Sequence, residues 1–205
     1  MGVLVTSAND RGTGVVKQDE KRLVAKIKAG LPQARAELIH TQYECIYRFL
    51  VHLTGAVHDA EDLTQETFTA AWQKIFQFEG RSSIGTWLHR IAYGKFVDSR
   101  RTSKRQATLV DRYADQDAPG SNRDPHEIAA AVDEARHLHD ALRLLNEAHR
   151  VLLVLHYLQG QSYQEMAEIL KEPLGTIKWR TREALVQLRS VLTKEAKHER
   201  SPTAR

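Results

Sequence analysis

The chain has 205 residues, of which 41% are hydrophobic and 27% are charged, with a formal net charge of +4. This length holds one domain or two small ones, and the single cysteine, Cys45, excludes an internal disulfide framework and a cysteine-based zinc site. No window approaches about 18 uninterrupted apolar residues, and no charged start leads into a long apolar run, so we expect a cytoplasmic protein without membrane insertion.

The first half of the chain predicts a mobile tail over residues 1–18 and then a helical domain over residues 19–101. Four helices are expected: a short one ended by Gly30, a longer one after Pro32, a third from about Asp59 and a fourth from about Ser83. Their apolar stripes would form one core, made of Leu23, Val24, Ile27, Leu38, Cys45, Ile46, Phe49, Leu50, Leu53, Ala60, Leu63, Thr67, Phe68, Ala71, Trp72, Ile75, Ile84, Trp87, Leu88, Ile91 and Val97.

Apolar residues become sparse from residue 102 to 124, which predicts a flexible linker. Helix is expected again from Asp124-Pro125, with an apolar face of Leu138, Ala141, Leu142 and Leu145. A further helix over about residues 147–159 presents Val151, Leu152, Val154, Leu155 and Leu158, and Gly160 ends it. The pattern predicts an all-α fold of two small helical domains, the second over residues 125–193, with a tail at 194–205.

Two short helices near the C-terminus have the pattern of a helix-turn-helix, the motif that presents one helix to the DNA major groove. Ser162 and Glu165 form a capping box at the start of the first helix. Pro173 and Gly175 are expected in the turn that follows.

The second of these helices has one apolar and one polar side. With Ile177 facing inward, the helical period also turns Thr181, Ala184, Leu185, Leu188 and Leu192 inward. Trp179, Arg182 and Val186 then point outward, where arginine can pair with guanines or phosphates and tryptophan can contact a thymine methyl. An ordinary amphipathic helix in a bundle is the alternative, and Trp179 could instead pack on a neighbouring domain.

Charge is segregated in the first domain, which is acidic around residues 59–66 and basic over residues 81–105. Asp62, Gln65, Glu66 and Thr69 fall on one polar face of the third helix, which suits a basic protein surface. A merely solvated face explains the same pattern. A metal-dependent nuclease that uses Asp62 and Glu66 is a further alternative, but no histidine or third carboxylate shares that face.

The fourth helix interleaves basic and aromatic residues, a mixture that holds single-stranded DNA because bases stack or insert and phosphates need cations. Trp87, Leu88 and Ile91 are assigned to the core. Arg90, Lys95, Ser99 and Arg100 are the candidates for DNA contact. Ten histidines occur, but no spacing among them predicts a metal site, and no cofactor is expected.

Three motifs resemble segments of bacterial sigma factors. Asp59–Phe68 followed by Ala71-Trp72 resembles the segment that binds core RNA polymerase, and Phe78–Ala92 resembles the promoter-melting segment. Gly175-Thr176-Ile177-Lys178 is similar to the opening of the helix that reads the −35 element. Their order and spacing match the extracytoplasmic-function (ECF) group, and the resemblance covers residues 19–192.

The resemblance implies a sigma factor with a region 2 domain and a region 4 domain, held inactive by an anti-sigma factor and performing no covalent chemistry. It implies that the acidic face binds the clamp helices of the largest polymerase subunit, and that the loop from Gly80 to Ser83 captures a base flipped from the −10 element. The implied −10 contacts are Arg81, Ser82, Ser83, Arg90, Lys95, Ser99 and Arg100. The implied −35 contacts are Thr176, Lys178, Trp179, Arg180, Arg182 and Glu183.

The sequence departs from the family pattern at Gly94, where asparagine is common, and at Trp179 and Glu183, where small polar and basic residues are frequent. These positions bear on promoter preference. A helix-turn-helix repressor or activator that works without polymerase is the rival hypothesis, but it leaves the acidic face and the melting segment unused.

Overall fold

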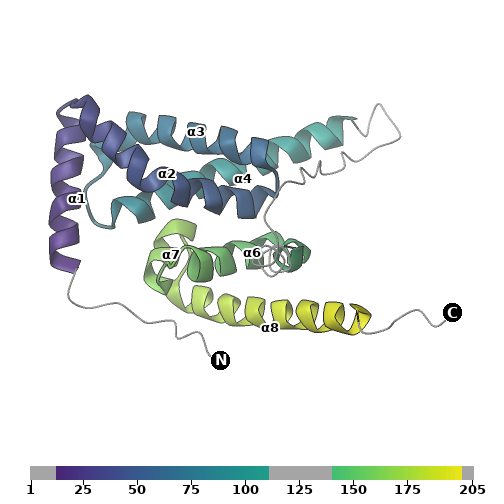
Figure 1. Cartoon of the computed structure of the whole chain (residues 1–205). Helices are drawn as coiled ribbons and strands as arrows, with labels where there is room; N and C mark the ends of the chain where they lie inside the picture. Colours follow the sequence, from purple (N-terminus) through teal and green to yellow (C-terminus); the bar gives the residue numbers. More distant parts are fainter. Residues whose placement is uncertain (1–12, 111–139, 200–205) are drawn as a thin grey trace.

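A computed structural model describes residues 13–110 and 140–199 of the chain, and every described regular element is a helix (Figure 1). The predicted linker beyond residue 110, the helix start at Asp124-Pro125, and Leu138 lie outside the described residues, as do residues 1–12 and 200–205. The described parts of the two predicted tails, residues 13–18 and 194–199, are instead helical. The all-α prediction is confirmed for the described part of the chain.

The N-terminal domain consists of α1 (Thr13–Lys28), α2 (Pro32–Thr54), α3 (Val57–Lys74), a short 3-10 helix η1 (Ile75–Gln77) and α4 (Ile84–Val110). Pro32 occupies the first helical position of α2, where its missing N–H costs no hydrogen bond. Gly55 ends α2 in the left-handed conformation, with a φ of 71°, and its N–H donates to the Val51 carbonyl. The helix boundaries therefore follow the proline and glycine signals of the sequence.

Most of the predicted core positions are buried, including Leu38, Phe49, Ala71, Ile84 and Leu88. Trp72, Trp87, Ile91 and Val97 are only half-buried and pack against the core from its edge. Two further residues of α4, Ala92 and Phe96, complete the core. Cys45 is half-buried and lies beside the second domain instead of inside the first.

Helix α4 continues to Val110, so the first nine residues of the segment predicted as a linker are helical. No glycine or proline occurs between Gly94 and Pro119, and a loss of apolar residues by itself does not end a helix. The domain boundary at residue 101 stays a prediction.

The C-terminal domain contains helical residues 140–144, α6 (Glu147–Leu153), a π-helical turn η2 (Val154–Leu158), α7 (Tyr163–Leu170) and α8 (Leu174–Glu199). Asn146 caps α6 by accepting a hydrogen bond from the His149 N–H at 2.8 Å. The π turn adds a residue to the helical register, and Leu158, which was expected on the apolar face, is 39% exposed.

The capping box of the helix-turn-helix is confirmed, because the Ser162 hydroxyl accepts from the Glu165 N–H and the Glu165 carboxylate accepts from the Ser162 N–H. The turn differs from the expected one. Lys171 takes the left-handed conformation, with a φ of 56°, whereas Gly175 lies inside the first turn of α8. Pro173 does lie in the turn, immediately before α8.

The two domains pack against each other. Helix α7 lies on α4, and α6 with η2 contacts α2, so that the α6–α8 unit sits below the α2–α4 layer in Figure 1. A single cluster of buried side chains includes residues from both domains, from Phe49 and Leu88 to Leu155 and Met166. The two helical domains, which the sequence predicts to be separated by a linker, are thus in direct contact.

Candidate nucleic-acid and protein interfaces

The outer face of α8 is open to solvent. Trp179 is 63% exposed, and Lys178 and Arg182 are exposed beside it. Ile177, Thr181 and Ala184 are buried on the opposite side, where the Thr181 hydroxyl donates to the Ile177 carbonyl at 2.8 Å. The predicted division of this helix into an inner and an outer face is therefore confirmed over its first three turns.

The inner stripe of α8 does not extend as far as expected, because Leu185 and Leu192 are 37% and 39% exposed. A step of about 100° per residue places Leu185 about 80° away from Ile177, at the edge of the stripe. Leu188, which lies closer to the centre of the stripe, is half-buried.

Two predicted −35 contacts have partners inside the domain. The Arg180 guanidinium donates to both carboxylate oxygens of Glu172 at 2.6 Å, and so fastens the turn to α8. Glu183 lies 3.7 Å from the imidazole of the buried His149. Thr176 is half-buried. The side chains most available to a ligand are consequently Lys178, Trp179 and Arg182.

The four predicted polymerase contacts on α3, namely Asp62, Gln65, Glu66 and Thr69, are all exposed. Asp62 lies 3.7 Å from the His58 imidazole, one turn earlier in the same helix, so the expectation that no histidine shares this face was wrong. Glu66 accepts from Lys95 of α4 at 3.0 Å. Within residues 13–110 and 140–199, no group of three or more His, Cys, Asp or Glu side chains is placed to hold a metal ion.

The loop before α4 contains the first three predicted −10 contacts. Arg81 is exposed and pairs with Glu79. Ser82 is half-buried, and Ser83 caps α4 by accepting from the Thr86 N–H at 3.0 Å. Ser83 therefore has a structural role that the sequence analysis did not assign to it.

The remaining predicted −10 contacts lie along α4. Arg90 and Ser99 are exposed, Lys95 pairs with Glu66, and Arg100 donates to Glu147 of α6 at 3.0 Å. Gly94 is also exposed, and a Cβ added there would meet no atom within 4 Å. Packing therefore does not require glycine at position 94.

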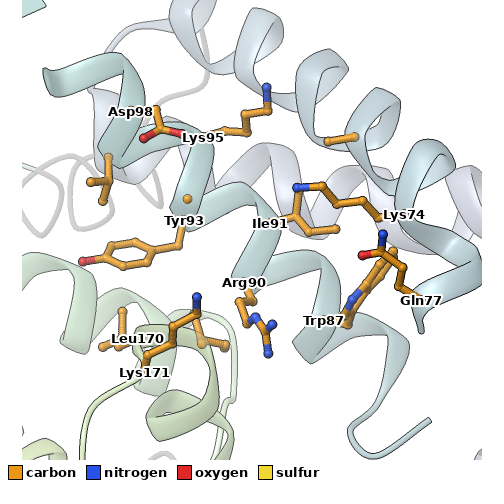
Figure 2. Close-up of a pocket in the computed structure, with 14 residues that line it drawn as sticks. Lys74, Gln77, Trp87, Arg90, Ile91, Tyr93, Lys95, Asp98, Leu170 and Lys171 are labelled. Atoms are coloured by element: carbon orange, nitrogen blue, oxygen red, sulfur yellow. The ribbon is translucent and has the colours of Figure 1, made fainter. Parts of the chain in front are cut away.

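A groove of about 450 Å³ lies between α3, α4 and the end of α7. Lys74, Arg90 and Lys171 reach it from three different helices or helix ends, and Trp87 and Tyr93 line its walls (Figure 2). Burial, followed by the nearby Glu172 and Glu147 carboxylates, raises the pKa of Tyr93, so this phenol stays neutral at physiological pH. The groove combines cations with aromatic rings, as a surface for single-stranded nucleic acid does.

The contacts between the two domains were not predicted from the sequence. The Thr86 hydroxyl donates to Glu165 Oε1 at 3.1 Å, and the Cys45 thiol donates to Gln159 Oε1 at 2.9 Å. The guanidinium of Arg150 donates to the Leu53 carbonyl at 3.2 Å. Helical periodicity shows which side of each helix is apolar, but it does not show which helices meet.

His89 of α4 lies near this contact and is 1% exposed. Its Nδ1 lies 2.9 Å from the Gly85 carbonyl oxygen, to which it donates, and its ring packs edge-on against Phe49. Burial lowers the pKa of His89, and the hydrogen bonds to Gly85 and Gln159 oppose that shift only in part. The imidazole is therefore neutral in the packed arrangement.

No helix among the described residues is both long enough and apolar enough to cross a membrane.

In a comparison with known proteins, both halves of the chain match family descriptions. The family description "Sigma-70 region 2" matches residues 38–106, and "Sigma-70, region 4" matches residues 141–190. The ECF RNA polymerase sigma factor SigW of Bacillus subtilis is 28% identical over 184 residues, which cover 84% of this chain and 96% of SigW. The ECF RNA polymerase sigma factor SigL of Mycobacterium tuberculosis is 30% identical over 170 residues, covering 80% and 94% respectively.

Among solved structures, the sigma factor RpoE of Bartonella quintana, crystallised with the anti-sigma factor NepR, superimposes with a TM-score of 0.63 at 25% identity. The superposition covers 77% of this chain and 96% of RpoE.

Proposed function

The chain belongs to the ECF group of the sigma-70 family. We propose that three of its surfaces bind, respectively, the −35 element, the melted −10 strand and core RNA polymerase during transcription initiation. The chain is a sigma factor, which directs core RNA polymerase to promoters. One domain corresponds to region 2 and the other to region 4.

The outer face of α8 reads duplex DNA at the −35 element. The observation that carries this assignment is the exposure of Trp179 and Arg182 opposite the buried Ile177, Thr181 and Ala184, in a helix that follows a capped helix and a tight turn. Lys178 and Arg182 supply charge-assisted contacts to phosphates or guanine edges, and Trp179 supplies apolar contact. Arg180 and Glu183 hold the helix in place and contact DNA from its edge, together with Thr176.

The loop over residues 80–83 and the basic side chains of α4 hold the melted −10 strand. Arg90, Lys95 and Arg100 lie on this one helix, and the aromatic-lined groove beside Arg90 offers room for an unstacked base. Unstacking costs on the order of a few kcal/mol, which the cations and rings of this surface must offset. Arg81, Ser82, Ser83 and Ser99 complete this surface.

The acidic face of α3 docks on the basic clamp helices of the largest polymerase subunit through Asp62, Gln65, Glu66 and Thr69. The support is that all four side chains are exposed on one helix face, and that none is needed for the core. The chain acts without covalent chemistry and works in the cytoplasm, where its DNA and polymerase partners lie. An anti-sigma factor holds it inactive, as the similarity to the RpoE–NepR complex suggests.

The deciding experiment adds the purified full chain to bacterial core RNA polymerase on fragmented genomic DNA and sequences the transcripts. Transcripts that start at defined positions only when the chain is present support the proposal. Asp62→Ala should lower core binding and transcript yield together, whereas Glu37→Ala, at an exposed position of α2, should leave both unchanged. A chain that binds DNA but never changes where polymerase starts would instead act as a polymerase-independent regulator.

A further inference from the structure

Three cations without a partner line the groove between α3, α4 and the end of α7 (Figure 2). Lys74 is the last residue of α3, Arg90 lies in α4, and Lys171 follows the last residue of α7. Among the described residues, none of these three side chains forms a hydrogen bond or an ion pair. Like charges that share one concave site repel each other, and the field that they produce there attracts an anion.

The other charged groups of the lining leave the groove positive. Lys95 pairs with Glu66 at 3.0 Å, and Asp98 is the one carboxylate among the described residues that line the groove. A single carboxylate offsets only one of the three unpaired cations. The groove therefore suits a ligand that carries more than one negative charge.

Lys171 occupies a backbone position that favours glycine. It caps α7 with a φ of 56°, and among the described residues it alone has a positive φ without being glycine. A left-handed lysine is less favourable than glycine there, because its Cβ crowds the backbone. Packing gives no reason for lysine, since its side chain is exposed and bonds to no described residue. Residues held in such conformations cluster at ligand sites, and here the conformation brings a cation to the groove.

Two aromatic rings and a glycine supply the groove with apolar surface. Trp87 is half-buried, and its ring centroid lies 5.3 Å from that of Phe78, which holds it in place. Tyr93 is half-buried on the same helix. Gly94 also lines the groove, and a Cβ added there would meet no atom within 4 Å, so the α4 backbone is open to a ligand at this point. Aromatic faces of this kind stack on nucleobases of any sequence.

The size of the groove favours a small molecule. Its volume of about 450 Å³ lies in the range of pockets that bind small ligands. A nucleoside polyphosphate joins one planar base to several phosphates and fits this combination of rings and cations. A DNA strand offers the same groups, but it carries only one charge per nucleotide and would meet the three cations one at a time.

We propose that the groove binds a free nucleoside polyphosphate, with the base on the aromatic wall and the phosphates on Lys74, Arg90 and Lys171. The site itself does not depend on the proposed function. Its consequence does, because Arg90 is also assigned to the melted −10 strand, so that the nucleotide and the strand compete for this residue. By linkage, each ligand weakens the binding of the other by the same factor.

Isothermal titration calorimetry of the full chain with ATP and GTP tests the site without DNA or polymerase. Adenosine or guanosine and inorganic triphosphate are the matched probes, since each carries one part of the ligand. We expect the tighter of the two nucleotides to bind at least about tenfold more tightly than its nucleoside or triphosphate alone. Binding of neither nucleotide, or equal binding of the nucleotide and either probe, would overturn the proposal.

Lys171→Gly separates nucleotide binding from folding. It removes a cation and relieves the left-handed lysine, so the melting temperature should not fall, whereas the affinity for the nucleotide should fall about tenfold. Lys21→Gln, at an exposed position of α1, removes the same charge elsewhere and should keep the wild-type affinity. Equal losses of affinity in the two variants would mean that only the net charge matters, and that the groove is not the site.

Gly94→Leu fills the groove from its α4 wall, and Gly94→Ala is the matched control that leaves most of the room. Both variants should fold, as circular dichroism can verify, because position 94 is exposed and a Cβ there meets open space. We expect Gly94→Leu to lose nucleotide binding and Gly94→Ala to retain it. Wild-type affinity in Gly94→Leu would place the nucleotide outside the groove.

Fluorescence anisotropy with a labelled single-stranded DNA of mixed sequence distinguishes a free nucleotide from a nucleotide within a strand. The nucleotide should displace this DNA from the wild-type chain, and about tenfold more should be needed for Lys171→Gly. If Lys171→Gly and Gly94→Leu weaken DNA binding as much as nucleotide binding, the groove is a strand site and the proposal fails. An absence of displacement would refute the competition for Arg90. Failure of the proposed function would appear separately, as the absence of new transcript starts with core polymerase, and would leave the calorimetric result unchanged.

Discussion

The hydroxyl of Thr86 and the carboxylate of Glu165 meet at 3.1 Å, although 79 positions separate them in the sequence. The other carboxylate oxygen of Glu165 accepts from the Ser162 N–H at 2.8 Å and completes the capping box of α7. One side chain therefore stabilises both the start of the helix-turn-helix and its contact with the N-terminal domain.

Glu165→Ala should lower the free energy of unfolding by about 1–2 kcal/mol, because it removes a helix cap and leaves a buried hydroxyl with one partner fewer. Glu165→Gln should cost less, since glutamine also serves in a capping box. Thermal unfolding followed by circular dichroism measures both. Glu168→Ala, at an exposed position of α7, is the control and should stay within about 0.5 kcal/mol of wild type.

Arg150 should be among the least replaceable residues of the C-terminal domain. Its guanidinium donates to the carbonyls of Leu142, Arg143 and Leu145, and across the boundary to that of Leu53. Arg150→Met should lower the free energy of unfolding by about 2–4 kcal/mol, because four carbonyl groups lose their donor. Arg150→Lys should recover little of this loss, since an ammonium cannot span four acceptors. Urea unfolding curves measure both variants. Equal free energies of unfolding for Arg150→Lys and wild type would contradict the prediction.

Mild acid should destabilise the packed arrangement through His89. Because burial lowers its pKa, the unfolded chain binds this proton more readily than the folded chain does. The stabilisation is complete above the ordinary imidazole pKa of about 6.5, and is lost as the pH falls from there through the lowered pKa. His89→Gln should flatten this part of the pH–stability profile, whereas His40→Gln, at an exposed position of α2, should not. Identical pH–stability profiles for His89→Gln and wild type would show that His89 does not cause the loss of stability in mild acid.

Gly94→Ala should raise the free energy of unfolding by about 0.5–1 kcal/mol, because it removes a flexible residue from within α4 and its Cβ meets open space. Gly55→Ala should have the opposite effect. Its φ is 71°, and an added Cβ would lie 3.2 Å from the Arg143 guanidinium. Differential scanning calorimetry should therefore show a higher melting temperature for Gly94→Ala and a lower one for Gly55→Ala. A lower melting temperature for Gly94→Ala would indicate that α4 needs a bend at this position.

Arg182→Ala should weaken promoter binding and reduce the slope of log affinity against log salt by about one, if Arg182 neutralises a phosphate. Its stability should not change, because its side chain is exposed. Arg180→Ala should instead lower stability, since it breaks the pair with Glu172. Lys21→Ala, at an exposed position of α1, is the control for a general loss of positive charge. A salt slope unchanged in Arg182→Ala would remove this residue from the phosphate-binding surface.

Features that depend on neighbours in the sequence were predicted well. The capping box of Ser162 and Glu165, the stop at Gly55 and the buried side of α8 at Ile177 all follow from local chemistry and helical period. Gly175 was wrongly expected in the turn and lies in α8, and the left-handed conformation of Lys171 was not predicted, because lysine carries no signal for a positive φ. The pairing of Thr86 with Glu165 could not be predicted, since it depends on how the two domains pack, which the helical period of each domain does not determine.

The ion pair between Lys95 and Glu66 joins a side chain assigned to DNA with one assigned to polymerase. When DNA binds Lys95 or polymerase binds Glu66, the ion pair breaks and the other side chain becomes available to its own partner. The free-energy cost of breaking the pair is therefore met only by the partner that binds first. This makes the two binding events cooperative, and each partner must strengthen the other by the same factor. An exposed pair is worth up to about 1 kcal/mol, which sets that factor at about fivefold or less.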